Sequence, residues 1–314
     1  MLSRRNIRIK VLQQLYAFQQ QSNLSLPSLS KTLKTDYENV YNIYYFSLSF
    51  LENLNDFLES ERLIESEKYF PSKVHIRKTF FIERLGFYNA LIDDNNYKLG
   101  KQRGKFSWKN HGNLFNKFFE DIVQYDFFKE FDLFEMPEKE VQKQFLTNLF
   151  ELAFNEFELF EDALSEEYVL WDDDSADVLQ AIIKCVDKFY DKDKISVEKP
   201  EFKQIEGMGF GDELLNKCVI EKDSFNQMIA DNLSNWDSER LTITDTILLR
   251  MALAEFIHFE TIPPKATINE YLDIAKLYST PKSHIFLNGV LDKIKIQLTQ
   301  SGKMKKSGVG LKTE

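Results

Sequence analysis

The spacing of apolar residues along the chain predicts helices almost from end to end. In the first predicted helix, from Ser3 to Gln20, apolar residues recur at helical intervals at Ile7, Val11, Leu15 and Phe18. Helix breakers are scarce, since the 314 residues include 28 Phe and 13 Tyr but only 11 Gly and 7 Pro. Further helices are predicted over residues 37–61, 72–91, 114–134, 138–164, 178–189, 212–219, 223–233 and 242–259. The pattern therefore predicts an all-α protein.

The last two predicted helices form an αα-hairpin. Pro263 and Pro264 suit the start of a helix, because proline lacks an N–H group and has a fixed φ. An apolar stripe follows, and a polar break over residues 279–283 separates it from a second amphipathic helix that reaches Ile294. Two amphipathic helices joined by a short turn that contains proline are typical of this motif.

The composition is that of a globular protein, with 43% hydrophobic and 29% charged residues. No apolar run is long enough to span a bilayer, and no apolar segment follows the basic N-terminal residues as a signal peptide would require. Cys185 and Cys218 stand alone, which suits a reducing compartment. We therefore expect a cytoplasmic protein with no membrane partner.

Basic residues crowd the first turns of the first helix, although the chain carries a net charge of −10. They are Arg4, Arg5, Arg8 and Lys10. Cations at a helix N-terminus oppose the macrodipole, so stability alone would not select them there. The cluster is consistent with an RNA-binding helix start and also with a solvated basic terminus.

The sequence offers no support for catalysis or for a cofactor. The four histidines (His75, His111, His258 and His284) do not stand at metal-ligand spacing with one another or with the cysteines. No nucleophile elbow, phosphate-binding loop or dinucleotide-binding motif occurs between a strand and a helix. We therefore predict a binding protein without catalytic residues, metal ligands or cofactor.

Both ends of the chain resemble the NusB family of transcription antitermination factors. The C-terminal match is the string I-P-x-K-x-x-I-N-E-x-x-x-x-A-K-x-x-x-x-x-x-S-H-x-F-x-N-G-V-L-D-K-I, which runs from Ile262 to Ile294. Residues 249–256 resemble the family's L-R-x-A-L-x-E-L helix, and residues 4–16 resemble its R-R-x-x-R-x-x-x-L-Q-x-L-Y start. The resemblance implies an all-α NusB-like helical bundle with an additional inserted helical region.

This organisation divides the chain into four segments. Residues 1–21 form the Arg-rich first helix, and residues 206–298 form the C-terminal bundle of the same NusB-like domain. Residues 299–314 are expected to form a flexible basic tail. The insertion, residues 22–205, contains Phe- and Leu-rich helices that can be superimposed in sequence on the following bundle by aligning Trp171 with Trp236. A degenerate second NusB-like unit and a chance phasing of amphipathic helices both explain this echo.

The resemblance also implies partners and site residues. NusB proteins bind single-stranded boxA RNA of ribosomal RNA leaders together with the small-subunit ribosomal protein that acts as NusE, within the RNA polymerase elongation complex. The RNA-binding residues expected here are Arg4, Arg5, Arg8, Lys10, Lys265, His284 and Phe286. The residues expected to bind the ribosomal protein are Asp245 and Tyr16. Core packing is the alternative for Phe286, and a solvated helix face is the alternative for Asp245.

Departures from the family pattern leave other functions open. Ile285 stands where the family often has Lys, and Lys282 where it often has Asp. The insertion also replaces the family's short second helix. A protein-binding scaffold that retained the fold but lost RNA binding is the main alternative. An RNA methyltransferase with a NusB-like domain is less consistent, because no alternation of strands and helices remains for a catalytic domain.

Overall fold

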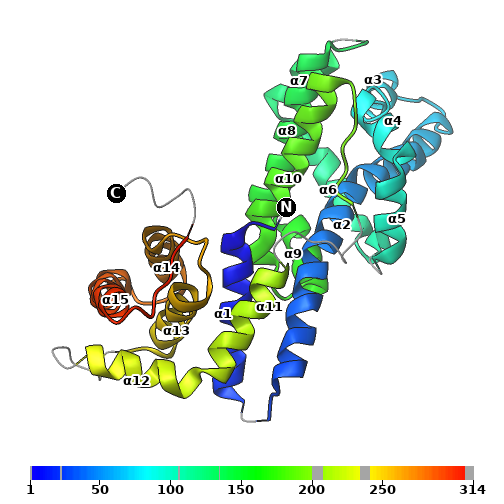
Figure 1. The fold of residues 1–314 in the computed structure, drawn as a ribbon. Helices are drawn as coiled ribbons and strands as arrows, with labels where there is room; N and C mark the ends of the chain where they lie inside the picture. The colour runs from blue at the N-terminus through cyan, green and yellow to red at the C-terminus, as the bar shows by residue number, and fades with distance from the viewer. Residues whose placement is uncertain are drawn as a thin grey trace. The chain divides into compact units, whose positions relative to one another are not determined.

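The computed structural model describes residues 2–21, 23–104, 107–133, 135–199, 208–233 and 241–307, and every regular element within these ranges is a helix (Figure 1). The prediction of an all-α protein is confirmed. The chain divides into two compact units. Residues 2–37 and 204–314 form one, here called the terminal unit, and residues 38–203 form the other, the middle unit.

The terminal unit combines the two ends of the chain. It contains the start of α2 (Leu26–Ser66) and the helices α1 (Arg4–Gln20), α11 (Met208–Ile220), α12 (Lys222–Asn232), α13 (Ile243–His258), α14 (Pro264–Tyr278) and α15 (Ser283–Gln300). The helix α13 lies at its centre and packs against α1, α11, α12, α14 and α15. Because every residue from Ile247 to Phe256 is buried, α13 is enclosed on all sides, as expected for a helix without a continuous polar face.

The middle unit is built around aromatic side chains. It contains the rest of α2 and the helices α3 (Lys73–Lys78), α4 (Gly86–Asp93), α5 (Asn95–Arg103), η1 (Trp108–Asn110), α6 (Gly112–Ile122), α7 (Asp126–Asp132), α8 (Lys139–Asn155), α9 (Glu158–Glu167) and α10 (Trp171–Lys192). The Trp108 ring stacks on Phe46 with 4.1 Å between centroids, and its indole N–H donates to Ser49 Oγ. Trp108 is therefore a core residue.

Several element boundaries differ from the sequence-based prediction. The helix α2 begins at Leu26, so Pro27 lies in its first turn, where a missing N–H group costs nothing. The helix α11 begins at Met208. The tail predicted from residue 299 is helical to Gln300, and residues 303–307 fold back onto the C-terminal end of α13. There the Lys306 amine donates to the Glu255 carbonyl, and the Ser307 N–H donates to the carbonyl of Glu260, two residues after the helix. The proposed alignment of Trp171 with Trp236 lies partly outside the described residues.

Candidate nucleic-acid interface

The first helix packs antiparallel to α13 through a buried ion pair. Arg8 donates from Nε to Oε1 of Glu255 at 2.6 Å and from Nη2 to Oε2 at 3.0 Å. Arg8 is 3% exposed and Glu255 is 0% exposed. Further along α1, Leu12 and Tyr16 lie beside Thr244 near the start of α13. The antiparallel arrangement follows from these two contacts.

Glu255 also accepts hydrogen bonds from the hairpin. The Tyr271 hydroxyl donates to Oε1 at 2.6 Å, and the Thr267 hydroxyl donates to Oε2 at 3.0 Å. Burial disfavours the charged form of Arg8, but the hydrogen bonds and charge of Glu255 outweigh it, so the pKa of Arg8 is raised. A buried pair of charges needs such additional hydrogen bonds to offset its desolvation.

Lys10 is buried as well, with 1% of its surface exposed. Its charge favours the ionised form of Asp36, whose pKa is nevertheless raised by burial. Arg8 and Lys10 were expected to contact phosphates. That assignment needs correction, because neither side chain has the exposed surface that a phosphate contact requires. Both hold α1 in the terminal unit.

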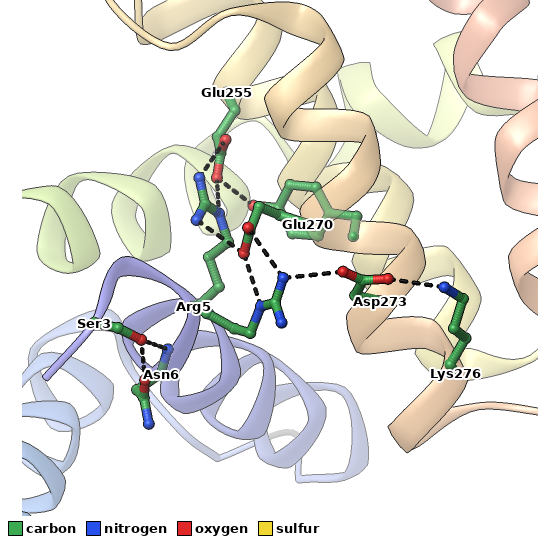
Figure 2. A network of polar contacts seen from close by, with 9 residues as sticks. Ser3, Arg5, Asn6, Glu255, Glu270, Asp273 and Lys276 are labelled. Carbon is green, nitrogen blue, oxygen red and sulfur yellow. Dashed lines mark hydrogen bonds and ion pairs between the residues drawn. The ribbon is translucent and has the colours of Figure 1, made fainter. Parts of the chain in front are cut away.

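Arg5 lies at the edge of the same network and is partly open to solvent, with 45% of its side chain exposed. Figure 2 shows its guanidinium between two carboxylates of α14, with Nε 3.0 Å from Glu270 Oε2 and Nη2 2.9 Å from Asp273 Oδ2. Lys276 donates in turn to Asp273 at 2.8 Å. Side-chain hydrogen bonding with Glu270 raises the pKa of Arg5. Sequence reasoning did not identify these carboxylates, because only the fold brings them to Arg5.

Arg4 and Lys265 are two further exposed cations of this region. The Arg4 guanidinium lies 5.8 Å from the centroid of the Phe210 ring, and it forms no ion pair with a carboxylate of the described residues. Lys265 lies in the first turn of α14, two residues before Thr267. Its amine has no acidic partner in the part of the chain that the structure describes.

The remaining predicted residues lie at the other end of α13. Asp245 is 1% exposed and completes a capping box with Thr242. Its carboxylate also accepts from Ser279 Oγ at 2.7 Å and from Ser283 Oγ at 3.0 Å. Asp245 therefore ties the start of α13 to the turn of the hairpin and is not a surface contact. The solvated-face alternative for Asp245 is therefore wrong, and a role toward the ribosomal protein would have to act through the turn that Asp245 holds.

His284 and Phe286 begin α15 beside that turn. Phe286 is partly buried and packs against the hydrophobic core, which agrees with its core-packing alternative. His284 is also partly buried. Asp245 and Glu255 are ten residues apart on α13, which corresponds to about 15 Å along a helix axis. The structure thus separates the predicted residues into an arginine end and a hairpin-turn end.

An open pocket of about 350 Å³ lies at the hairpin-turn end. Its lining consists of Leu12, Gln13, Tyr16, Thr244 and Tyr278. Tyr16, predicted as a partner contact, is 44% exposed in it. The pocket lining combines apolar side chains with a few polar groups, as a docking site for a protein side chain would. Leu12 and Gln13 belong to the N-terminal motif that resembles NusB, whereas Thr244 and Tyr278 gave no separate signal in the sequence.

The described residues contain no cluster of three or more His, Cys, Asp or Glu side chains that could hold a metal ion. None of the helices in the described ranges has the length and apolar character needed to cross a membrane.

Comparison with known proteins identifies the C-terminal part of the chain. Residues 173–295 match the NusB family model. This segment is a NusB-family domain. The NusB match begins inside α10 and includes the hairpin, while α1 lies outside it. No solved structure matches the chain.

Three NusB relatives illustrate the extent of the similarity. The transcription antitermination protein NusB of Salinibacter ruber is 38% identical over 102 residues, which are 32% of this chain and 64% of the relative. The protein of the same name from Chloroherpeton thalassium is 39% identical over 31% of this chain and 46% of its own length. That from Clostridium botulinum is 45% identical over 23% and 55%. The matched region thus covers between about half and two thirds of each relative.

Proposed function

We propose that the protein is a non-enzymatic transcription antitermination factor that acts in the cytoplasm on ribosomal RNA operons. It binds single-stranded boxA-type leader RNA together with the small-subunit ribosomal protein that serves as NusE, in the RNA polymerase elongation complex. The observation that supports this proposal most is the match of residues 173–295 to the NusB family. The relatives carry the name of transcription antitermination proteins.

The proposed RNA contacts are the exposed cations at the arginine end. Arg4 and Lys265 bind phosphates directly, and Arg5 binds a third when it exchanges a carboxylate partner for the phosphate. A guanidinium suits both a phosphate and an unpaired base edge. Arg8 and Lys10 are buried and contribute indirectly, because they hold α1 in its place in the terminal unit. His284 is a further contact for the strand at the opposite end of α13.

The proposed site for the ribosomal protein is the pocket at the hairpin-turn end. Tyr16 offers an aromatic face and a hydroxyl at its rim, and aromatic residues of this kind are enriched in protein interfaces. Asp245 acts indirectly, because it holds the turn beside the pocket through Ser279 and Ser283.

The salt dependence of RNA binding tests the proposal. Three neutralised phosphates on a single strand give a log–log slope of about −2, or roughly twentyfold weaker binding of a boxA-type strand between 50 and 200 mM salt. Arg4→Ala with Lys265→Ala should remove about 1.4 from that slope. A double alanine variant of Lys31 and Lys34, two exposed lysines on α2, is the matched control and should change the slope less.

A protein-binding scaffold is the second candidate, and the burial of Arg8 and Lys10 favours it, because their charges already have structural partners. Binding of a boxA-type strand, measured with and without the ribosomal protein, separates the two functions. If the chain binds the ribosomal protein but no boxA-type strand, with or without that protein present, the scaffold is correct and antitermination through RNA binding is not.

A further inference from the structure

Two adjacent aromatic rings of the middle unit lie in solvent between α2 and α3. Tyr69 is 91% exposed and Phe70 is 84% exposed. Their rings are perpendicular, with centroids 4.7 Å apart. Burying an aromatic ring stabilises a folded protein, so two rings left in water on one short connection contribute little to this fold. Their exposure indicates a binding role.

The same stretch of chain is basic. From Lys68 to Ile82 the sequence has no Asp or Glu, although the whole chain carries a net charge of −10. Its cations are Lys68, Lys73, Arg77 and Lys78. Lys73 and Lys78 have no acidic partner in the described ranges. Arg77 keeps 58% of its side chain exposed while it contacts Asp132. We call residues 68–82 the aromatic–basic segment.

Aliphatic residues also lie exposed nearby, chiefly Leu63 at the end of α2 and Val74 in α3. An apolar patch of this kind alone would suit a protein partner equally well. The lysines favour a nucleic acid over a protein as the partner. Protein interfaces are depleted in lysine, whereas surfaces that bind single-stranded nucleic acid combine exposed aromatic rings with a row of cations. The charge and the exposed rings together favour a nucleic acid.

We propose that the aromatic–basic segment is a second contact for single-stranded RNA. Tyr69 and Phe70 stack on unpaired bases, and Lys73, Lys78 and the exposed Arg77 neutralise neighbouring phosphates. Every base has an aromatic face, so the contact tolerates any sequence. The segment lies outside the region that matches the NusB family. The choice of RNA as the ligand rests on the proposed function, but the site shares no residue with the surface proposed for boxA-type RNA.

Binding of a labelled 12-nucleotide uridine strand to the full chain tests this site, because such a strand carries no boxA sequence. Tyr69→Ala with Phe70→Ala should weaken its binding at least tenfold, since the loss of a stacking ring weakens binding by roughly five- to 150-fold per base. Val169→Ala, at a residue that is 98% exposed in the same unit, is the control and should leave the affinity unchanged. Lys73→Ala with Lys78→Ala should reduce the salt slope by about 1.4.

A direct stacking measurement completes the test. Tyr69→Trp should retain binding, and its additional tryptophan fluorescence should be quenched by the uridine strand. Lys31→Ala with Lys34→Ala, at exposed lysines outside both proposed RNA surfaces, should leave uridine binding unchanged. If boxA-type RNA does not bind but the uridine strand binds through Tyr69 and Phe70, the proposed function fails and this site stands. No uridine binding, or binding that is insensitive to removal of both rings, overturns the site.

Discussion

Arg8 and Glu255 lie 247 residues apart in the sequence and form a buried ion pair with two hydrogen bonds. The pair joins the first helix to the central helix of the terminal unit. Because removal of one partner leaves an uncompensated buried charge, such a change typically costs about 3–5 kcal/mol. The buried members of the N-terminal basic cluster, Arg8 and Lys10, thus serve the packing of the fold and not an RNA-binding surface.

We expect Arg8→Ala to lower the free energy of unfolding by about 3 kcal/mol or more, because it leaves Glu255 buried without its cation. Urea unfolding followed by circular dichroism measures the change. Arg4→Ala, at the exposed neighbour, should stay within about 0.5 kcal/mol of the parent. Replacing both partners, as Arg8→Met with Glu255→Leu, should recover part of the loss. Equal stability of the two single variants would contradict the structural role of Arg8.

Asp245 is expected to act on stability rather than on partner contact. Asp245→Ala removes the capping box and leaves the Ser279 and Ser283 hydroxyls without their shared acceptor, which should cost about 2 kcal/mol. Asp223→Ala is the control, since this exposed residue lies in the first turn of α12 without a cap hydrogen bond. A loss of ribosomal-protein binding with unchanged stability would show that Asp245 contacts the partner after all.

The two arginines illustrate how far the sequence can predict such a site. Apolar periodicity identified the central helix and the hairpin, because local spacing alone decides which helix face is buried. Arg8 and Arg5 are paired with carboxylates of α13 and α14, which tertiary packing alone brings close to them. Composition and local spacing carry no information on such distant pairs.

Asp245 is a different case, because its structural role left a local signal. Thr242 and Asp245 have the spacing of a capping box immediately before an apolar run. That pattern predicts a helix start and a carboxylate directed at the backbone. The resemblance to NusB suggested a surface role instead, and the local pattern was the better guide to where the side chain lies.

Glu270 and Asp273 are expected to weaken RNA binding by occupying Arg5. Their carboxylates hold the guanidinium at 3.0 and 2.9 Å, in the place that a phosphate would take. Glu270→Gln with Asp273→Asn should therefore tighten the binding of a boxA-type strand severalfold, because Arg5 then contacts its phosphate without giving up a carboxylate partner. Fluorescence anisotropy measures the affinity. The same change made together with Arg5→Ala should give a smaller gain, and an equal gain there would exclude Arg5 as the phosphate contact.

Lys306 is expected to make stability depend on pH. Its amine donates to the carbonyl oxygens of Glu255 at 2.9 Å and Phe259 at 2.8 Å, at the C-terminal end of α13. Burial lowers the pKa of Lys306 from its ordinary 10.5 to about 8. Between these two values the unfolded chain binds more protons than the folded chain, so this residue makes stability rise with pH in that window.

The matched comparison for Lys306 is Lys306→Met. Between pH 7 and pH 10 the free energy of unfolding of the parent should rise by on the order of 1 kcal/mol more than that of this variant. This value is reduced for solvent screening of the half-buried amine. Urea unfolding at each pH measures it, and tyrosine ionisation affects both proteins alike. A difference that stays constant across the range would show that Lys306 titrates as it does in water.

Gly211 lies where α11 meets α1 and the start of α2, and it has no room for a side chain. A Cβ atom there would lie 2.0 Å from the Tyr37 hydroxyl and 2.7 Å from Ile7 Cγ2, so a larger residue must displace both. Gly211→Ala should therefore cost about 1–3 kcal/mol, as overpacking typically does. Gly209→Ala is the matched control, because no atom of the described residues lies within 4 Å of a Cβ atom at that position and alanine favours a helix. Urea unfolding of the two variants decides the point. If Gly211→Ala is as stable as Gly209→Ala, the close approach of Tyr37 and Ile7 to α11 is wrong, and so is the packing that places the first helix in the terminal unit.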